Sequence, residues 1–357
     1  MLAFIRDREN DFDVRFFVNE LADASKNLGI LEAKIESYQF NRILIPLLQK
    51  KEAVSSMYIE GTQTTITDVL KDELNSEPND DKIRIEVRNH VRTLAFGAEY
   101  LRNGKFTHSF MHQLHEQLMT GIVAPGLEKS IGRYKKKDNQ IRSSTGMLVY
   151  TPPAASETKK FMNELLSFMN DSGDGLHPLI KAAMIHSQFE SIHPFSDGNG
   201  RIGRLLISLY LYKAGVINFP FFYMSEAINL DKSVYYRMLT NSRTSSLDEW
   251  MKYFLHKISV QTVRHIEYID ALSALYGQTK DAVKNCVNSP KFDEIIECLF
   301  TYPVLNAVIL EDQLAVSHGQ AVRYLHVLEE NHILLGDDRK RGKHYYFSEL
   351  IDLAQRN

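Results

Sequence analysis

Twelve residues near the middle of the chain combine side chains that could carry out chemistry on phosphate groups. The segment runs from His193 to Arg204 and reads His-Pro-Phe-Ser-Asp-Gly-Asn-Gly-Arg-Ile-Gly-Arg. Its glycine-rich part leads into a predicted helix beginning near Arg201, so main-chain N–H groups and the positive helix end would converge on one point. Such a point binds phosphate, and Arg201 and Arg204, three residues apart, would neutralise further phosphates.

Two more side chains complete the predicted site. Asp197 is placed to hold Mg²⁺, which prefers one or two carboxylates together with substrate oxygens. His193, whose type has an unperturbed pKa of about 6.5, can take a proton at neutral pH. Each feature alone is usually a turn, loop punctuation or a solvated helix face. Their joint occurrence in one loop predicts phosphoryl or nucleotidyl transfer.

These residues resemble the motif of the Fic (Fido) family, His-x-Phe-x-Asp/Glu-Gly-Asn-Gly-Arg-x-x-Arg, at every fixed position. The resemblance implies an adenylyltransferase that uses ATP as substrate and Mg²⁺. His193 would deprotonate a Tyr, Thr or Ser hydroxyl of a target protein, which attacks the α-phosphate and expels pyrophosphate. By the same resemblance Asp197 is the metal ligand, and Asn199 with the Gly198 and Gly200 amides forms an anion hole.

The resemblance also assigns the arginines and their neighbours. Arg201 would contact the β-phosphate and Arg204 the γ-phosphate, with Ile202 and Gly203 between them in the same ATP-binding segment. Phe195 would be buried beneath the loop.

Candidates for the adenine side are assigned more loosely. Residues 224–230 and the pair Tyr235-Tyr236 resemble the family segment that lines the adenine, which implies contacts from Leu230 and Tyr236. Both could equally belong to the core. Gln188, less than two helical turns before His193, could also face the nucleotide.

A second motif lies upstream and resembles the inhibitory pattern Ser/Thr-x-x-x-Glu-Gly/Asn of many Fic proteins. It is formed by Ser56, Glu60 and Gly61. One helical turn separates Ser56 from Glu60, so the hydroxyl and the carboxylate share one side of a helix. The resemblance implies that Glu60 pairs with Arg204 and takes the place of the γ-phosphate, since a carboxylate pairs well with a guanidinium group. In some relatives the same Glu also helps to remove AMP, so a bifunctional enzyme stays open.

The elements that must position these residues are predicted to be mainly α-helical. Helical spacing runs through residues 30–59 with an end or kink at Pro46, and a helix over 54–60 should stop at Gly61. Residues 140–150 read as a β-hairpin about a short turn. The hairpin lies where the Fic family places its flap, an exposed strand edge that docks the target protein by main-chain pairing.

The chain divides into four predicted segments. Residues 1–104 form an N-terminal helical region with the inhibitory helix, and residues 105–269 form the Fic catalytic core. A connector over 270–290 leads to a small C-terminal winged helix-turn-helix over 291–357, in the order helix, helix, helix, hairpin. The fold class is therefore a Fic helical bundle with a β-hairpin flap and a winged-helix-like module.

The winged helix raises a rival interpretation, a DNA-binding regulator. Residues 290–357 carry seven basic residues against eleven acidic ones, a difference of -4. Contacts to phosphates supply most non-specific DNA affinity, so the net negative charge of the module disfavours DNA binding. Basic residues do cluster between Arg339 and Lys343. We therefore favour protein docking or dimerisation over DNA binding for the module. Transfer of another nucleotide or of a phosphate group by the same loop is the enzymatic alternative.

Composition sets the remaining expectations. The formal net charge is -3, which gives no global reason to bind nucleic acid or an anionic membrane. Cys286 and Cys298 are too few for a disulfide framework, as expected in a reducing compartment. No export signal is visible, and the longest apolar stretch is far shorter than the about 20 residues that span a bilayer. We expect a cytoplasmic protein without membrane contact. Self-modification and a homodimer are plausible, and the target stays unknown.

Overall fold

The computed structural model describes residues 2–37, 41–72, 82–142, 145–220, 222–339 and 341–356. In these ranges the chain is mainly helical, as predicted, and its strands are short. The helices are α1 (Val18–Ser37), α2 (Asn41–Ile59), α3 (Ile66–Asp72), α4 (Lys82–Asn103), α5 (His108–Met119), α6 (Thr158–Asn170), α7 (Pro178–Ile192), α8 (Asn199–Lys213), α9 (Ser225–Asn229), α10 (Lys232–Asn241), α11 (Asp248–Cys286), α12 (Phe292–Thr301), α13 (Ala307–Leu314), α14 (His318–Glu330) and α15 (Ser348–Gln355). The strands are β1 (Ile141–Arg142), β2 (Leu148–Tyr150), β3 (Val304–Leu305), β4 (Leu335–Gly336) and β5 (Tyr345–Tyr346).

Helices α7 and α8 form the centre of the bundle and pack against each other. Both are buried on nearly every side, which explains why apolar residues fill α7 without a clear polar face. Pro178 starts α7, where its missing N–H costs no hydrogen bond, and the His177 side chain caps the helix by accepting from the Leu179 amide. The loop of residues 193–198 joins the two helices and carries the predicted chemistry.

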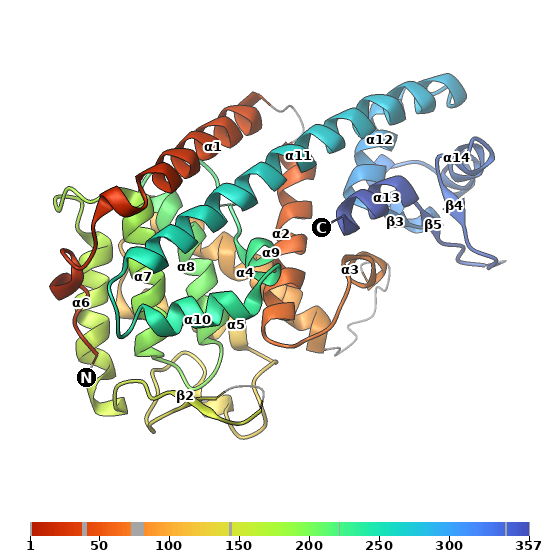
Figure 1. Cartoon of the computed structure of the whole chain (residues 1–357). Helices are drawn as coiled ribbons and strands as arrows, with labels where there is room; N and C mark the ends of the chain where they lie inside the picture. Colours follow the sequence, from red (N-terminus) through yellow and green to blue (C-terminus); the bar gives the residue numbers. More distant parts are fainter. Residues whose placement is uncertain are drawn as a thin grey trace.

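Helix α11 is the longest element and runs from the bundle to the C-terminal module (Figure 1). Helix α1 lies along it. The sequence shows weak periodicity after residue 270, where we expected a connector. The structure continues α11 as a helix to Cys286, so most of the predicted connector is helical.

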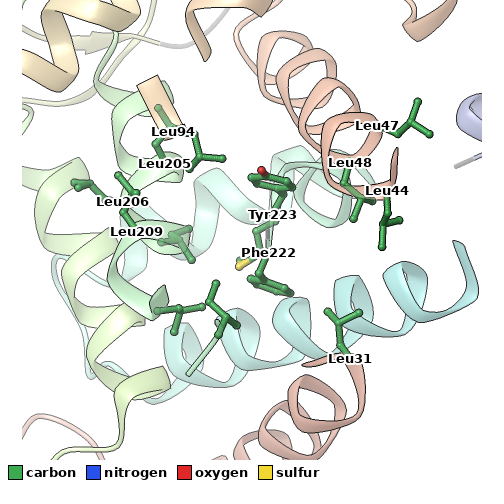
Figure 2. Close-up of a cluster of buried hydrophobic side chains, with 14 of the residues drawn as sticks. Leu31, Leu44, Leu47, Leu48, Leu94, Leu205, Leu206, Leu209, Phe222 and Tyr223 are labelled. Atoms are coloured by element: carbon green, nitrogen blue, oxygen red, sulfur yellow. The ribbon is translucent and has the colours of Figure 1, made fainter. Parts of the chain in front are cut away.

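The hydrophobic core joins segments that are far apart in sequence. Figure 2 shows part of it, in which leucines of α1, α2, α4 and α8 surround Phe222 and Tyr223, the residues just before α9. Phe222 is completely buried. The same cluster extends to α12, α14 and α15, so one continuous core ties the module to the bundle. No helix within the described ranges has the length and apolar character to cross a bilayer.

The sequence predicts an end or a kink at Pro46, and helix α2 passes through this residue without ending. Pro46 is the sixth residue of the helix, so only the bond that its N–H would have made to residue 42 is lost. Packing against α4 and α9 offsets that loss. The predicted stop is confirmed, because Gly61 has φ 94° just after the last helical residue, Ile59.

The predicted hairpin is present as the antiparallel pair β1 and β2. Ile141 pairs with Tyr150 and Arg142 with Leu148, with an irregularity between them. Residues 143 and 144 of the predicted flap lie outside the described residues. Met147, Leu148 and Val149 are exposed, so the hairpin presents apolar side chains to solvent.

The C-terminal module, residues 292–355, contains α12 to α15 and a three-stranded antiparallel sheet in the order β3-β5-β4. The predicted order of three helices followed by a hairpin is found as α12, α13 and α14 and the pair β4 and β5. Strand β3 and helix α15 were not predicted.

The module packs on the helices that precede the catalytic core. A small apolar cluster joins the two parts and contains Ile66, Leu70, Val304, Ile351 and Ala354. Lys51 Nζ of α2 also donates to the Arg356 carbonyl oxygen at 2.9 Å.

Candidate active site

The loop between α7 and α8 is shaped by two residues in the left-handed region. His193 ends α7 with φ 48° and ψ 61°, and its amide donates to the Phe189 carbonyl oxygen. Gly198 precedes α8 with φ 76°, a conformation that favours glycine. Helix bonding in α8 begins with the Ile202 amide, which donates to Gly198 O at 3.0 Å, so the earlier amides of the first turn point out of the helix. The main-chain N–H groups of this first turn lie where the sequence predicts an anion site, although the Gly198 amide already donates to Asp197 Oδ1.

Side chains from inside and outside the loop fix its shape. Asn199 Oδ1 accepts from the Phe195 amide at 2.8 Å, and Asn199 Nδ2 donates to Phe195 O at 2.9 Å. Asn139 Nδ2 donates to both His193 O and Phe195 O. Both polar atoms of the Asn199 side chain thus bond the loop itself, and its main-chain N–H lies in the first turn of α8.

Phe195 lies under the loop with 0% exposure, as predicted. The His115 ring stacks on it, with the ring centres 4.0 Å apart. His115 Nδ1 accepts from the Gly132 amide, so Nε2 carries the proton and donates to Asp197 O at 3.0 Å. Burial lowers the pKa of His115 to about 4, which keeps the ring neutral and the loop supported at neutral pH.

Arg204 is held by the predicted inhibitory motif on α2. Its Nη2 donates to Glu60 Oε1 at 2.7 Å and to Ser56 O at 3.1 Å, and its Nε donates to Ser56 Oγ at 3.0 Å. A Cβ atom on Gly200 would lie 2.6 Å from Glu60 Oε1, so the carboxylate sits directly over the first turn of α8. Glu60 occupies the point where the sequence predicts a phosphate.

The charges of this pair reinforce each other. Burial raises the pKa of Glu60, but the charge and hydrogen bond of Arg204 outweigh it and hold that pKa below its ordinary value. Burial lowers the pKa of Arg204, and Glu60 more than restores it. Both groups are therefore ionised at neutral pH, and the Arg204 side chain is only 2% exposed.

Arg201 is oriented by two carboxylates. Its Nη1 donates to Glu86 Oε1 of α4 at 2.5 Å, and its Nη2 donates to Asp197 Oδ1 at 3.3 Å. The Arg201 and Glu86 side chains are nearly buried, whereas Asp197 is 36% exposed. Asp197 Oδ1 also accepts from the Gly198 amide. The arginine and the predicted metal ligand are thus held side by side at the same end of α8.

A pocket of about 660 Å³ opens beside Gly200 and Arg204. Glu60, His193, Gly200, Arg204 and Tyr236 of the predicted site line it. Further lining comes from the flap and from α10, and includes Ile141, Val149, Lys232, Tyr235, Leu239 and Arg243. The structure therefore brings the base, the anion site, the flap and one adenine-side candidate to a single cavity.

Two ionisable groups in the pocket have strongly shifted pKa values. Burial, aided by Lys135, lowers the pKa of His193 to about 4, so the imidazole is neutral at pH 7. Its Nδ1 is buried, and a main-chain hydrogen bond to Glu190 opposes the shift in pKa, which leaves Nε2 as the nitrogen that can face the pocket. Burial raises the pKa of Glu190 to about 7, and its Oε1 is also buried and unpartnered.

Of the predicted ATP contacts, Gly198, Asn199 and Arg201 lie in the loop and the first turn of α8 but do not line this pocket. Four others lie elsewhere. Gln188 is buried and its Nε2 donates to Ala3 O at 3.0 Å, so it faces the N-terminal segment. Leu230 is 54% exposed and lines a different pocket, between α2, α3 and α9. Ile202 and Gly203 are buried within α8 and do not line the cavity.

Three residues of the site were not predicted from the sequence. Glu190 lies three residues before His193 on α7, and this spacing could have revealed it. Glu86 and Arg243 come from α4 and from the residues after α10, and no local pattern marks them.

The donor set fits a magnesium nucleotide. Amides of the α8 first turn and two arginines suit a triphosphate, and Asp197 suits a cation that takes its other ligands from phosphate oxygens. Among the described residues no three His, Cys, Asp or Glu side chains gather as a metal site, so Asp197 would be the protein ligand.

Comparison with known proteins places these features in a family. Residues 105–211 match the Fic/DOC family, and residues 18–99 match the N-terminal region of the Fic/DOC family. Over 180 residues the chain is 26% identical to a probable protein adenylyltransferase of Aquifex aeolicus, an alignment covering 49% of this chain and 51% of that protein. It is 30% identical over 159 residues to the protein adenylyltransferase Fic of Nematostella vectensis, covering 41% and 37% of the two chains. The chain thus spans about half or less of the length of these relatives.

Solved structures agree on the fold. A Fic family protein from Desulfovibrio desulfuricans superposes with a TM-score of 0.57 at 20% identity, covering 92% of this chain and 95% of that one. A Fic domain containing signaling protein from Bacteroides thetaiotaomicron gives a TM-score of 0.54 at 24% identity, covering 68% and 95%. Together with the matches over both family regions and the loop between α7 and α8, these findings show that the chain belongs to the Fic/DOC family.

Proposed function

We propose that this chain is a protein adenylyltransferase, which transfers AMP from ATP to a Tyr, Thr or Ser hydroxyl of a target protein. The observation that carries the proposal is that one pocket holds His193, Gly200 and Arg204 together. A base and an anion site in one cavity support group transfer from a phosphoanhydride. The names of the relatives support AMP as the group transferred.

The reaction follows from this arrangement. The target hydroxyl oxygen attacks the α-phosphorus, the bond to the bridging oxygen of the β-phosphate breaks, and pyrophosphate leaves. His193 Nε2 accepts the hydroxyl proton, for which its neutral imidazole is ready at pH 7. Main-chain amides of the α8 first turn and the guanidinium groups of Arg201 and Arg204 stabilise charge on the phosphates. Mg²⁺ held by Asp197 would supply further charge neutralisation at the phosphate oxygens.

We also propose that Glu60 inhibits this activity. Its carboxylate bonds Arg204 and lies over Gly200, so a γ-phosphate and Glu60 would compete for one position. Ser56 reinforces the contact, because its hydroxyl and carbonyl oxygens accept from Nε and Nη2 of the same guanidinium group. ATP would bind productively only after α2 releases Arg204.

The flap is the proposed docking site for the target. Its strands are short and exposed, so one strand edge is available for main-chain pairing with an extended segment. Met147 and Leu148 add apolar contacts that any target chain could use. This mode of docking is consistent with a hydroxyl brought to the pocket beside His193.

The test uses labelled ATP, Mg²⁺ and a cell lysate. We expect the Glu60→Gly variant to label protein targets much more strongly than the natural chain. The double variant with His193→Ala should label nothing, because no base remains. Mass spectrometry of the labelled protein separates the enzymatic alternatives, since AMP, another nucleotide and phosphate add different masses. Equal labelling by the natural chain and Glu60→Gly would overturn the proposed inhibition.

Removal of AMP by the same site stays an alternative, because Glu60 lies in the same pocket as His193. The test is to incubate the AMP-modified target with the natural chain. Release of free AMP would support this alternative, because removal of AMP would require Glu60.

For the C-terminal module we favour protein contact over DNA binding. The basic side chains described in the predicted wing are partly neutralised, because Arg339 pairs with Asp337 and Lys343 with Glu329. Lys340 lies outside the described residues. A salt-dependent mobility shift with random duplex DNA tests the rival. A cytoplasmic location, self-modification and a homodimer stay predictions.

A further inference from the structure

Arg243 connects the flap to the helix that ends at His193. It follows α10 and lines the same pocket as His193 and Arg204. Its guanidinium carbon lies 4.1 Å from the centre of the Tyr150 ring, the last residue of β2. Its Nε donates to Ser191 Oγ at 3.2 Å, two residues before His193 on α7. The Arg243 side chain thus contacts both the flap, where the target would dock, and α7, the helix that leads to His193.

The contacts of Arg243 differ from those of the other pocket arginines. Arg204 pairs with Glu60 and Arg201 with Glu86, whereas no carboxylate of the described residues lies within 4.0 Å of Arg243. A guanidinium group placed over an aromatic face is attracted by the negative charge of that face, more strongly when water is excluded. Tyr150 therefore takes the place that a carboxylate takes for the other two arginines.

The flap has few stabilising contacts of its own. Its two strands contain only two and three residues, and an isolated two-stranded hairpin is marginally stable in water. Met147, Leu148 and Val149 are exposed and contribute little packing of their own. Tyr150 is only partly exposed, and its contact with Arg243 joins β2 to the bundle.

We propose that Arg243 is a positioning residue that sets the place of the flap relative to His193 by stacking on Tyr150 while bonding Ser191. The proposal rests on the proposed function in assigning target docking to the flap. Its consequence is that a target segment paired with the flap is presented at a fixed distance from the base. A second role for Arg243, direct binding of a nucleotide phosphate, is the competing outcome.

The experiment uses the full chain carrying Glu60→Gly, with and without further substitutions. Hydrogen exchange followed by mass spectrometry measures the protection of peptides covering residues 145–150, without nucleotide or target. Arg243→Gln keeps a side-chain donor for Ser191 but removes the charge, and Tyr150→Leu removes the ring. We expect each to speed flap exchange roughly 2- to 30-fold, the range that corresponds to one cation–π contact. The double variant should show no further increase.

Conservative variants are the controls. Tyr150→Phe keeps the aromatic face and Arg243→Lys keeps the charge, so both should retain most of the flap protection. Exchange in α7 peptides reports whether the fold is intact, and it should not change. Labelling of lysate proteins should fall in Arg243→Gln and Tyr150→Leu, while Mg·ATP affinity measured by calorimetry stays the same.

Two results would overturn the proposal. One is flap exchange that stays unchanged in Arg243→Gln. The other is a loss of Mg·ATP affinity in Arg243→Gln that Tyr150→Leu does not share, which would assign Arg243 to phosphate binding. If the Glu60→Gly chain transferred no AMP, the proposed function would fail, whereas the exchange measurement would still decide the contact between Arg243 and the flap.

Discussion

Glu60 Oε1 accepts a hydrogen bond from Arg204 Nη2 at 2.7 Å, and this contact joins the end of α2 to α8. The Arg204 side chain is 2% exposed and that of Glu60 34%, so the pair lies at the inner wall of the pocket. A carboxylate in this position is negatively charged and pairs with the Arg204 guanidinium group, as a terminal phosphate would. We therefore expect nucleotide and Glu60 to exclude each other.

Replacing Glu60 should raise the affinity for nucleotide, even where AMP transfer cannot follow. We expect Glu60→Gly to bind Mg·ATP more than about tenfold more tightly than the natural chain, since about 1.4 kcal/mol of competition is already a factor of ten. Titration calorimetry with Mg·ATP measures this without any target. In the Glu60→Gly/His193→Ala double variant the gain in affinity should persist, because His193 is needed only for proton transfer. Equal affinities for the natural chain and Glu60→Gly would contradict competition at Arg204.

Ser56 should contribute to stability as well as to inhibition. Its hydroxyl oxygen accepts from Arg204 Nε in a buried environment, and a hydrogen bond to a charged group contributes about 1.5–3 kcal/mol. Ser56→Ala should therefore lower the free energy of unfolding by about that amount in chemical denaturation. It should raise AMP transfer less than Glu60→Gly does. Ser55→Ala on the same helix is the matched control, and an equal loss there would refute a specific role for Ser56.

Glu86 should be required for the orientation of Arg201. Glu86→Ala leaves a nearly buried guanidinium group without its shortest partner, for which a loss of about 3–5 kcal/mol is typical. Glu86→Gln retains an acceptor and should lose less. In the Glu60→Gly background both variants should also weaken Mg·ATP binding, because Arg201 is no longer held beside Asp197. Glu99→Ala, at an exposed site on the same helix, should leave both measurements unchanged.

The pH profile of the reaction should lack the usual histidine step. Burial lowers the pKa of His193 to about 4, so the free enzyme keeps a neutral base as pH falls until it approaches that value. We expect kcat/KM of Glu60→Gly to show no acidic decline near pH 6.5, since this ratio reports ionisations of the free enzyme. Glu190, whose pKa burial raises to about 7, titrates in the same range, so the profile is measured in a Glu190→Gln background as well. A decline centred near pH 6.5 in both backgrounds would show that His193 is more exposed to water than its buried Nδ1 indicates.

Predicted site residues that are close along the chain are also close in the structure. His193, Gly200 and Arg204 come from one segment and line one pocket. The pairing of Glu60 with Arg204 was implied by family resemblance alone, and the structure brings the two together. The two residues assigned to the adenine side by a loose resemblance lie in different places. Tyr236 lines the pocket that contains His193, whereas Leu230 lines another pocket.

What could not be predicted depends on contacts between distant segments. Glu86 is separated from Arg201 by 115 residues, and nothing in the local pattern of α4 distinguishes it from a surface glutamate. Pro46 would end a helix in isolation, but packing of α2 on its neighbours outweighs one missing hydrogen bond. Strand β3 has only two residues, too few for an alternating pattern, and it forms because β5 offers it a partner.

The left-handed backbone conformation of His193 lowers the stability of the folded chain at the residue that we propose as the base. A side chain with a Cβ atom is disfavoured there by about 1–2 kcal/mol relative to glycine. His193→Gly should therefore melt at a higher temperature than His193→Ala, although neither has a base. The protein thus accepts an unfavourable backbone torsion at the position of its proposed base, because glycine, which suits that torsion, carries no imidazole.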